Sequence, residues 1–130
     1  MVNQDYTHKW DGRSILVVED DESSAYLFGE ILKGTGIHVS FATNGEDAVR
    51  FIEAHPDTDL VLMDVHLPVK DGFTATKEIK ALSSTVRVIA QTAYAFSVDQ
   101  HEARRAGCDA LVNKPINRSV LLDKLTTLLD

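Results

Sequence analysis

The chain has 130 residues, of which 44% are hydrophobic and 25% are charged. This length suits one domain with one core, and the composition excludes a disordered or low-complexity chain. Twenty acidic residues against 13 basic ones give a net charge of −7, which argues against direct nucleic-acid binding, because such binding needs a basic face.

The use of cysteine and of apolar segments indicates the compartment. The single cysteine, Cys108, cannot form an internal disulfide, which fits a reducing environment. The first residues lack the apolar stretch of a signal peptide, and no segment approaches the roughly 20 apolar residues needed to cross a bilayer. We therefore expect a cytoplasmic protein without membrane insertion. Residues 1–13 are polar and are predicted to be a tail or a linker end, followed by one domain over 14–130.

Apolar runs and amphipathic stretches alternate from residue 14 onward. Residues 15–18 form a short apolar run typical of a strand buried on both faces. Helical spacing then predicts a helix that ends at the turn 34–36, with an apolar face formed by Ala25, Leu27, Phe28, Ile31 and Leu32. Residues 38–42 predict a weaker strand, and the next amphipathic stretch predicts a helix that ends before Pro56.

The second half of the chain continues this alternation. Apolar runs at 60–63, 86–90 and 110–113 predict three more strands. The helices expected between and after them run through Ala75, Ile79 and Leu82, over about 98–106 up to Gly107, and onward from an N-cap at Asn117. The core face of the last helix is predicted to contain Val120, Leu121, Leu125 and Leu128.

Five strands alternating with five helices indicate an α/β fold, a doubly wound five-stranded parallel sheet with helices on both faces. In such a sheet the functional site lies beyond the carboxyl ends of the strands, near the point at which the strand order reverses. The polar side chains that come at or just past the strand ends are then expected at one edge of the sheet: Glu19, Asp20, Asp64, Thr92 and Lys114.

This set of side chains indicates phosphoryl-transfer chemistry. Three neighbouring carboxylates repel one another, and a bound divalent cation relieves that repulsion. Oxygen ligands without histidine or cysteine favour Mg²⁺. Lys114 supplies a compact positive charge, Thr92 supplies a hydroxyl donor, and a carboxylate can act as the nucleophile. Each residue alone has an ordinary structural explanation, as a helix cap or a surface group, so their joint placement carries the prediction.

Four segments of the sequence resemble the receiver domain of two-component response regulators. They are 15–21 (ILVVEDD), 59–72 (DLVLMDVHLPVKDG), 91–93 (QTA) and 113–115 (NKP). The resemblance covers residues 14–130 and implies the flavodoxin-like (βα)5 receiver fold. It also implies a phosphorelay signalling module, not a metabolic enzyme, whose partner is a histidine kinase or a histidine phosphotransfer domain.

The resemblance implies a role for each acidic residue and for the metal. Asp64 matches the phosphoacceptor, which takes a phosphoryl group from phosphohistidine in a Mg²⁺-dependent reaction. Asp20 matches the direct Mg²⁺ ligand, and Glu19 matches an acid that acts partly through water. The residue two past the phosphoacceptor, His66, would give its main-chain carbonyl to the metal.

The same resemblance implies a switch. Thr92 matches the hydroxyl that moves to the phosphoryl group, and Lys114 matches the ammonium of the family, with a cis peptide bond to Pro115. The family often has an aromatic residue three before this lysine, whereas this chain has Leu111, so an aromatic rotamer switch is not expected. The surface that responds to phosphorylation is expected at 94–96 and the helix after them.

His66 and Tyr94 stand two residues past Asp64 and Thr92, beside the path of an attacking water. Our hypothesis is that these bulky side chains slow hydrolysis of the acyl phosphate.

Because the sequence stops at residue 130, we expect a stand-alone receiver or a piece of a hybrid sensor kinase. The lead-in at 10–12 and the segment 92–95 are similar to receivers attached to hybrid sensor kinases.

Three alternatives compete with the receiver interpretation. A haloacid dehalogenase-type phosphohydrolase with an aspartate nucleophile needs an acid two residues after the nucleophile and a cap insertion. This chain has His66 at that position, and the cap insertion is missing. A flavodoxin-like cofactor binder needs small polar residues to hold phosphate in the first turn, whereas 19–22 are four acids. A receiver that serves only as an unphosphorylated scaffold is disfavoured, because every motif position is filled.

Overall fold

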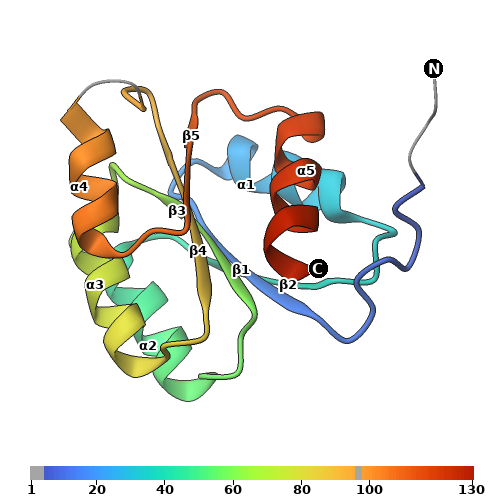
Figure 1. Cartoon of the computed structure of the whole chain (residues 1–130), viewed down its shortest axis with the longest axis horizontal. Helices are drawn as coiled ribbons and strands as arrows, with labels where there is room; N and C mark the ends of the chain where they lie inside the picture. The colour runs from blue at the N-terminus through green and yellow to red at the C-terminus, as the bar shows by residue number, and fades with distance from the viewer. Residues whose placement is uncertain (1–4, 96–97) are drawn as a thin grey trace.

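The computed structural model describes residues 5–95 and 98–130, in which strands and helices alternate as predicted (Figure 1). The strands are β1 (Ser14–Val18), β2 (His38–Ala42), β3 (Leu60–Asp64), β4 (Arg87–Thr92) and β5 (Ala110–Asn113). The helices are α1 (Glu22–Leu32), α2 (Gly45–Ala54), α3 (Gly72–Leu82), α4 (Val98–Ala106) and α5 (Arg118–Leu129). The predicted elements are therefore confirmed, with shifts of a few residues at some ends.

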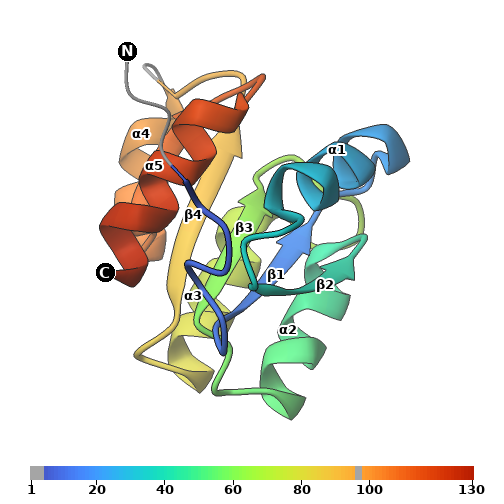
Figure 2. The ribbon, with the colours of Figure 1, turned by 90° about the vertical axis from the view of Figure 1, so that its right-hand side faces the viewer.

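The five strands form one parallel sheet in the order β2-β1-β3-β4-β5. The chain moves outward from β1 to β2 and then crosses to β3 on the other side of β1, so the strand order reverses between β1 and β3. Helices α1 and α5 cover one face of the sheet, and α2, α3 and α4 cover the other (Figures 1 and 2). The doubly wound α/β prediction is confirmed.

The core has two layers, one on each face of the sheet. Alternate residues of β1 belong to different layers, because successive strand side chains point to opposite faces. Ile15 packs with the cluster under α1 and α5, and Leu16 packs with the cluster under α2 and α3. Both side chains are 1% exposed or less, which explains why this run is apolar throughout.

Two residues predicted to face the core are exposed, Leu27 at 53% and Val120 at 37%. Leu27 lines the cavity at the carboxyl edge of the sheet, where its side chain is open to solvent. In α5 the buried face is turned by one residue from the predicted one and contains Leu121, Leu122, Leu125 and Leu129.

Residues 5–13, the described part of the lead-in, pack on the domain between α5 and the α1–β2 connection (Figure 2). Trp10 is 2% exposed and belongs to the core layer under α1 and α5. Its main-chain N–H donates to the carbonyl of Thr35 at 2.8 Å. Arg13 donates to the carbonyl of Leu129 at 2.6 Å, and Lys9 pairs with Asp130 at 3.7 Å, so the segment is tied to the end of α5.

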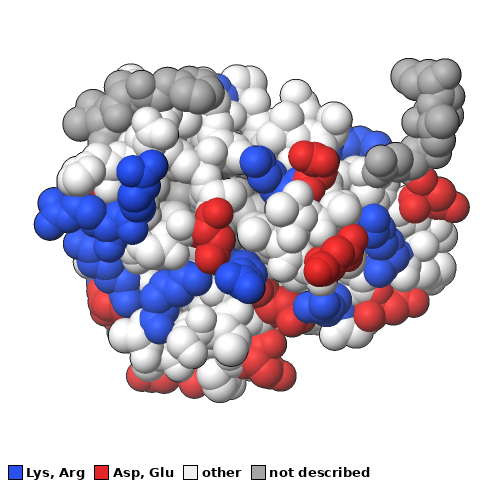
Figure 3. All heavy atoms as spheres, in the orientation of Figure 1, with Lys and Arg blue, Asp and Glu red and all other residues white. Residues whose placement is uncertain are grey.

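The surface carries both signs of charge. Figure 3 shows basic side chains gathered over α4, where the last turn contains Arg104 and Arg105, and mixed charges over the rest of that face. Within the described residues, no helix combines the length and apolar character of a membrane span.

Candidate functional site

The structure brings all five predicted side chains to the carboxyl edge of the sheet. Glu19 and Asp20 follow β1, Asp64 ends β3, Thr92 ends β4, and Lys114 follows β5. A cavity of about 460 Å³ opens at this edge and is lined by Glu19, Asp20, Asp64, His66 and Lys114, among others. The site lies next to the β1–β3 crossover, as the topology of a doubly wound sheet predicts.

Three carboxylates form the acidic part of the site. One oxygen each of Glu19, Asp20 and Asp64 lies within 4.8 Å of the others. Glu19 and Asp64 are 5% and 1% exposed, whereas Asp20 is exposed. Burial raises the pKa of Glu19 to about 7, and the neighbouring Asp64 carboxylate adds to this. An all-oxygen donor set with this charge suits a hard divalent cation such as Mg²⁺.

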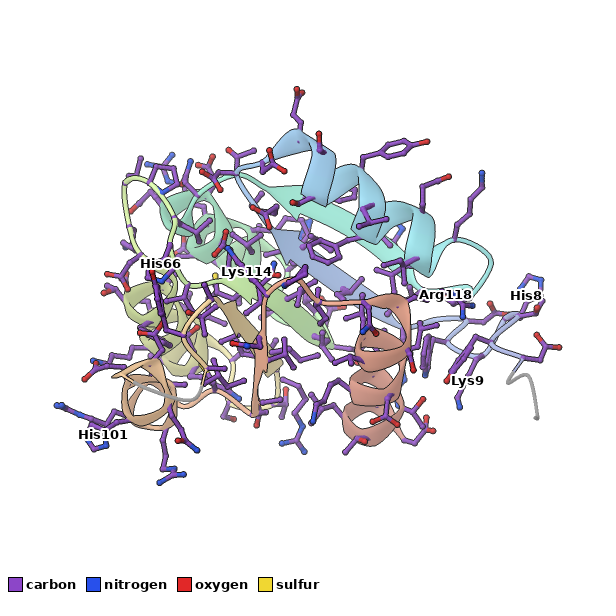
Figure 4. The ribbon with its side chains drawn as sticks, turned by 90° about the horizontal axis from the view of Figure 1, so that it is seen from above. His8, Lys9, His66, His101, Lys114 and Arg118 are labelled. Carbon is purple, nitrogen blue, oxygen red and sulfur yellow. The ribbon has the colours of Figure 1, made fainter. Side chains whose placement is uncertain are left out.

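The basic part of the site is Lys114. Its Nζ lies 2.8 Å from Oδ1 of Asp64, and the main-chain N–H of His66 donates to the same oxygen at 3.1 Å. The main-chain N–H of Lys114 donates to the carbonyl of Thr92 at 2.8 Å, and the bond to Pro115 is cis. Figure 4 shows Lys114 and His66 in one part of the molecule, away from His8, Lys9 and Arg118.

The Thr92 hydroxyl is turned toward α4. It donates a hydrogen bond to Oδ2 of Asp99, and it accepts one from the main-chain N–H of Tyr94 at 3.1 Å. The same Asp99 oxygen lies 3.6 Å from Nε2 of His66. The rings of His66 and Tyr94 meet edge to face, with their centroids 5.9 Å apart.

Sequence reasoning missed two residues of the site, Asp99 and Gln91. Gln91 is 2% exposed and donates from Nε2 to Oε1 of Glu19 at 3.2 Å, while the N–H of Asp21 donates to Oε2 at 3.2 Å. Glu19 is therefore held through both oxygens. The available signal was an amide side chain directly after the apolar run 88–90 of β4, since a buried polar group needs a partner. Asp21, also in the acidic run, is the N-cap of α1.

The turn between β3 and α3 fixes the backbone of Asp64. The N–H of Gly72 donates to the carbonyl of Val65 at 2.9 Å. A side chain at position 72 would place Cβ 2.3 Å from the carbonyl oxygen of Asp64, so this close approach requires glycine. In the same turn Val69 has a φ of 69°, a left-handed conformation that is rare for a β-branched residue.

Comparison with known proteins decides the family. The family model of the response regulator receiver domain matches residues 15–126. The chain belongs to the response regulator receiver family. This membership confirms the receiver interpretation and its (βα)5 fold.

The receiver domain has relatives among both bacterial and yeast proteins. The polar-differentiation response regulator DivK of Brucella anthropi is 35% identical over 107 residues, covering 81% of this chain and 86% of DivK. A sensor histidine kinase receiver domain from Pseudomonas aeruginosa, solved with a magnesium ion coordinated in the active site cleft, is 35% identical, with a TM-score of 0.81 and coverage of 91% of this chain and 98% of that one. A Saccharomyces cerevisiae co-crystal structure of the histidine phosphotransfer protein Ypd1 with the Ssk1 receiver domain matches with 28% identity, a TM-score of 0.80, and coverage of 89% and 88%.

Proposed function

We propose that this receiver domain accepts a phosphoryl group from phosphohistidine onto Asp64 in a Mg²⁺-dependent reaction, and that it then changes conformation. The observation that carries the proposal is the 2.8 Å contact between Lys114 Nζ and Asp64, beside three carboxylates whose oxygens lie within 4.8 Å. A buried nucleophilic carboxylate, an acidic metal site and a fixed cation are what phosphoryl transfer requires.

In the proposed transfer, a carboxylate oxygen of Asp64 attacks phosphorus. The new O–P bond forms while the P–N bond to the donor imidazole breaks, and the electron pair of that bond stays on the imidazole nitrogen. The Lys114 ammonium stabilises negative charge on the phosphoryl oxygens, in a partly buried position where charge interactions are stronger than in water. The product is an acyl phosphate on Asp64. Water later hydrolyses it slowly, which is autodephosphorylation.

The residues that would hold Mg²⁺ are the carboxylates of Asp20, Asp64 and, partly through water, Glu19, together with the main-chain carbonyl of His66. When bound, the ion neutralises charge between carboxylates and phosphoryl oxygens. Gln91 and the N–H of Asp21 orient Glu19 for this role. The related receiver domain with magnesium in its active site cleft supports the assignment.

The conformational response would begin at Thr92, whose hydroxyl turns to the phosphoryl group. The segment after β4 and helix α4 would follow and change a partner surface at 94–96 and α4. Of these residues, Phe96 lies outside the part that the structure describes. Leu111 is partly buried at the position where the family often has an aromatic residue, so the response would not depend on an aromatic rotamer there.

The proposed phosphodonor is a histidine kinase or a histidine phosphotransfer domain, in the cytoplasm. The receiver domain crystallised with a histidine phosphotransfer protein supports this choice. We propose that residues 14–130 form the receiver unit and that 1–13 lead into it. The net charge of −7 supports a partner other than nucleic acid.

A small-molecule phosphodonor with Mg²⁺ tests the proposal. Intact-protein mass spectrometry should show one added phosphoryl group that hydroxylamine removes, because hydroxylamine cleaves acyl phosphates. Asp64→Asn should gain none. Asp57→Asn removes an exposed carboxylate from the turn before β3 and should be phosphorylated as wild type is. Labelling of Asp64→Asn at the wild-type level would overturn the assignment of the phosphoacceptor.

A further inference from the structure

Asp99, in the first turn of α4, is hydrogen-bonded to the Thr92 hydroxyl, on which the proposed switch depends. Its Oδ2 accepts the hydrogen bond of the Thr92 hydroxyl, and its side chain is only 14% exposed. A hydrogen bond to a carboxylate is stronger than one between neutral groups, and it strengthens further where water is excluded. The described structure thus holds the hydroxyl toward α4.

We propose that Asp99 is a positioning residue that competes with the phosphoryl group for the Thr92 hydroxyl and so sets the threshold for activation. This inference rests on the proposed function, because it needs a phosphoryl group on Asp64. A hydroxyl has one proton to donate. Thr92 therefore donates either to Asp99 or to the phosphoryl oxygen, so a stronger hydrogen bond to Asp99 disfavours the one to the phosphoryl oxygen.

The same carboxylate also connects α4 to the β3–α3 turn. Its Oδ2 lies 3.6 Å from Nε2 of His66, which follows Asp64 by two residues. Asp99 thus contacts side chains from the ends of both β3 and β4. When Thr92 turns away, Asp99 loses its hydrogen bond with that hydroxyl, which weakens the attachment of the first turn of α4 as the phosphoryl group is bound.

Beryllofluoride titration measures this competition, because the ion imitates a phosphoryl group on aspartate without being hydrolysed. With Mg²⁺ saturating, Asp99→Ala should bind beryllofluoride about tenfold more tightly than wild type, the order expected for removing a charge-assisted hydrogen bond from the unbound state. Asp99→Asn should gain less than Asp99→Ala, because its amide oxygen still accepts the hydrogen bond, although more weakly than a carboxylate does. Glu102→Ala removes another α4 carboxylate and should leave the affinity unchanged.

A Thr92→Val background separates competition from simple charge repulsion. If Asp99 acts through the hydroxyl, Asp99→Ala should gain nothing once that hydroxyl is absent. An equal gain in both backgrounds, or no gain in either, would overturn the inference. The affinity for Mg²⁺ alone should be the same in wild type and Asp99→Ala. A general disturbance of the site would change that affinity.

The outcome is distinguishable from failure of the proposed function. If wild type binds beryllofluoride through Asp64 but Asp99→Ala binds it no more tightly, only the role of Asp99 is rejected. If neither protein binds beryllofluoride and Asp64→Asn behaves identically, the phosphoacceptor proposal itself is rejected. Asp99→Asn keeps the size of the side chain and provides the same comparison if Asp99→Ala does not fold.

Discussion

His66 and Tyr94 follow Asp64 and Thr92 by two residues each and are more than half exposed, His66 at 55% of its side chain and Tyr94 at 57% overall. Because their rings contact each other edge to face, we expect them to cover one side of Asp64 together. We predict that Tyr94→Ala or His66→Ala shortens the half-life of the acyl phosphate up to about tenfold, a barrier change of up to about 1.4 kcal/mol. Phosphate release measured after removal of the donor tests this.

The control for this prediction is Tyr26→Ala. Tyr26 is an aromatic residue of α1 that is 70% exposed and does not line the site cavity. Its replacement should leave the half-life unchanged. The shielding hypothesis fails if neither of the two site variants loses phosphate faster than wild type does.

Cys108 lies at the turn between α4 and β5 and is predicted to be unreactive. Burial raises the pKa of its thiol to about 11, although a hydrogen bond with Thr76 opposes the shift. At pH 7–8 almost no thiolate is present, so labelling by a thiol reagent should be far slower than that of a small free thiol. Labelling rates in native buffer and in denaturant give the test; equal rates would show that the thiol is not protected.

Individual site residues differ in how far the sequence reveals them. Asp64 and Lys114 stand at strand ends, so topology alone brings them together. Asp99 is seven residues beyond Thr92 and belongs to another element, so its contact depends on how α4 packs. Gln91 reaches Glu19 across the neighbouring strand, and only the three-dimensional register between β4, β3 and β1 places it there.

At the scale of elements, replacing either of two glycines by alanine should have opposite effects on stability. Gly72→Ala should destabilise the fold by roughly 1–3 kcal/mol, because its Cβ would lie 2.3 Å from the Asp64 carbonyl oxygen and backbone must shift. Gly29→Ala, inside α1, meets only the end of the Phe41 ring at 3.4 Å. It should stabilise the fold by up to about 1 kcal/mol, through better helix propensity.

Urea unfolding of both variants measures these free energies. Gly72→Ala should also weaken Mg²⁺ binding, because the displaced backbone carries Asp64, whereas Gly29→Ala should not. Equal stability of the two variants would show that the β3–α3 turn accommodates a side chain without strain.

The strands were predictable where helices bury both faces of the sheet. β1, β3 and β4 are apolar on both faces because helices cover both sides of the sheet, and their runs were evident. The exposed side chains of Leu27 and Val120 were not, because periodicity defines a helical face but not where the sheet beneath it ends. Alternating strands and helices predict a parallel sheet, whereas the β1–β3 crossover is given by the strand order of the structure.

At the scale of the molecule, Asp109 links three parts of one side of the domain. It accepts hydrogen bonds from Lys80 Nζ of α3 at 2.7 Å and from the Val88 N–H of β4 at 2.8 Å, and it contacts Arg87 at 3.4 Å. Burial alone would raise the pKa of Asp109, but these hydrogen bonds and charges hold it below its ordinary value. The fold is therefore stabilised when Asp109 is ionised.

The sign of this linkage predicts an acid-sensitive fold. The contribution of Asp109 is complete above the unfolded pKa of about 3.9 and is lost as the pH falls through the lower, folded value. Asp109→Asn should thus lower the free energy of unfolding at pH 7. Below about pH 4, this free energy should fall less steeply with pH in Asp109→Asn than in wild type. Urea unfolding from pH 7 downward tests this, with Asp123→Asn on the exposed side of α5 as control; parallel acid-side slopes for wild type and Asp109→Asn would contradict it.

The packing of Trp10 gives the molecule a built-in optical reporter. It is the only tryptophan of the chain, and its indole is enclosed beside the ring of Tyr6 and the ammonium of Lys9. Enclosed indoles fluoresce at shorter wavelengths than hydrated ones, so a red shift would signal that the lead-in has come away. Since Lys9 and His66 lie at opposite ends of the view in Figure 4, an emission change on beryllofluoride binding would register movement transmitted along the whole domain.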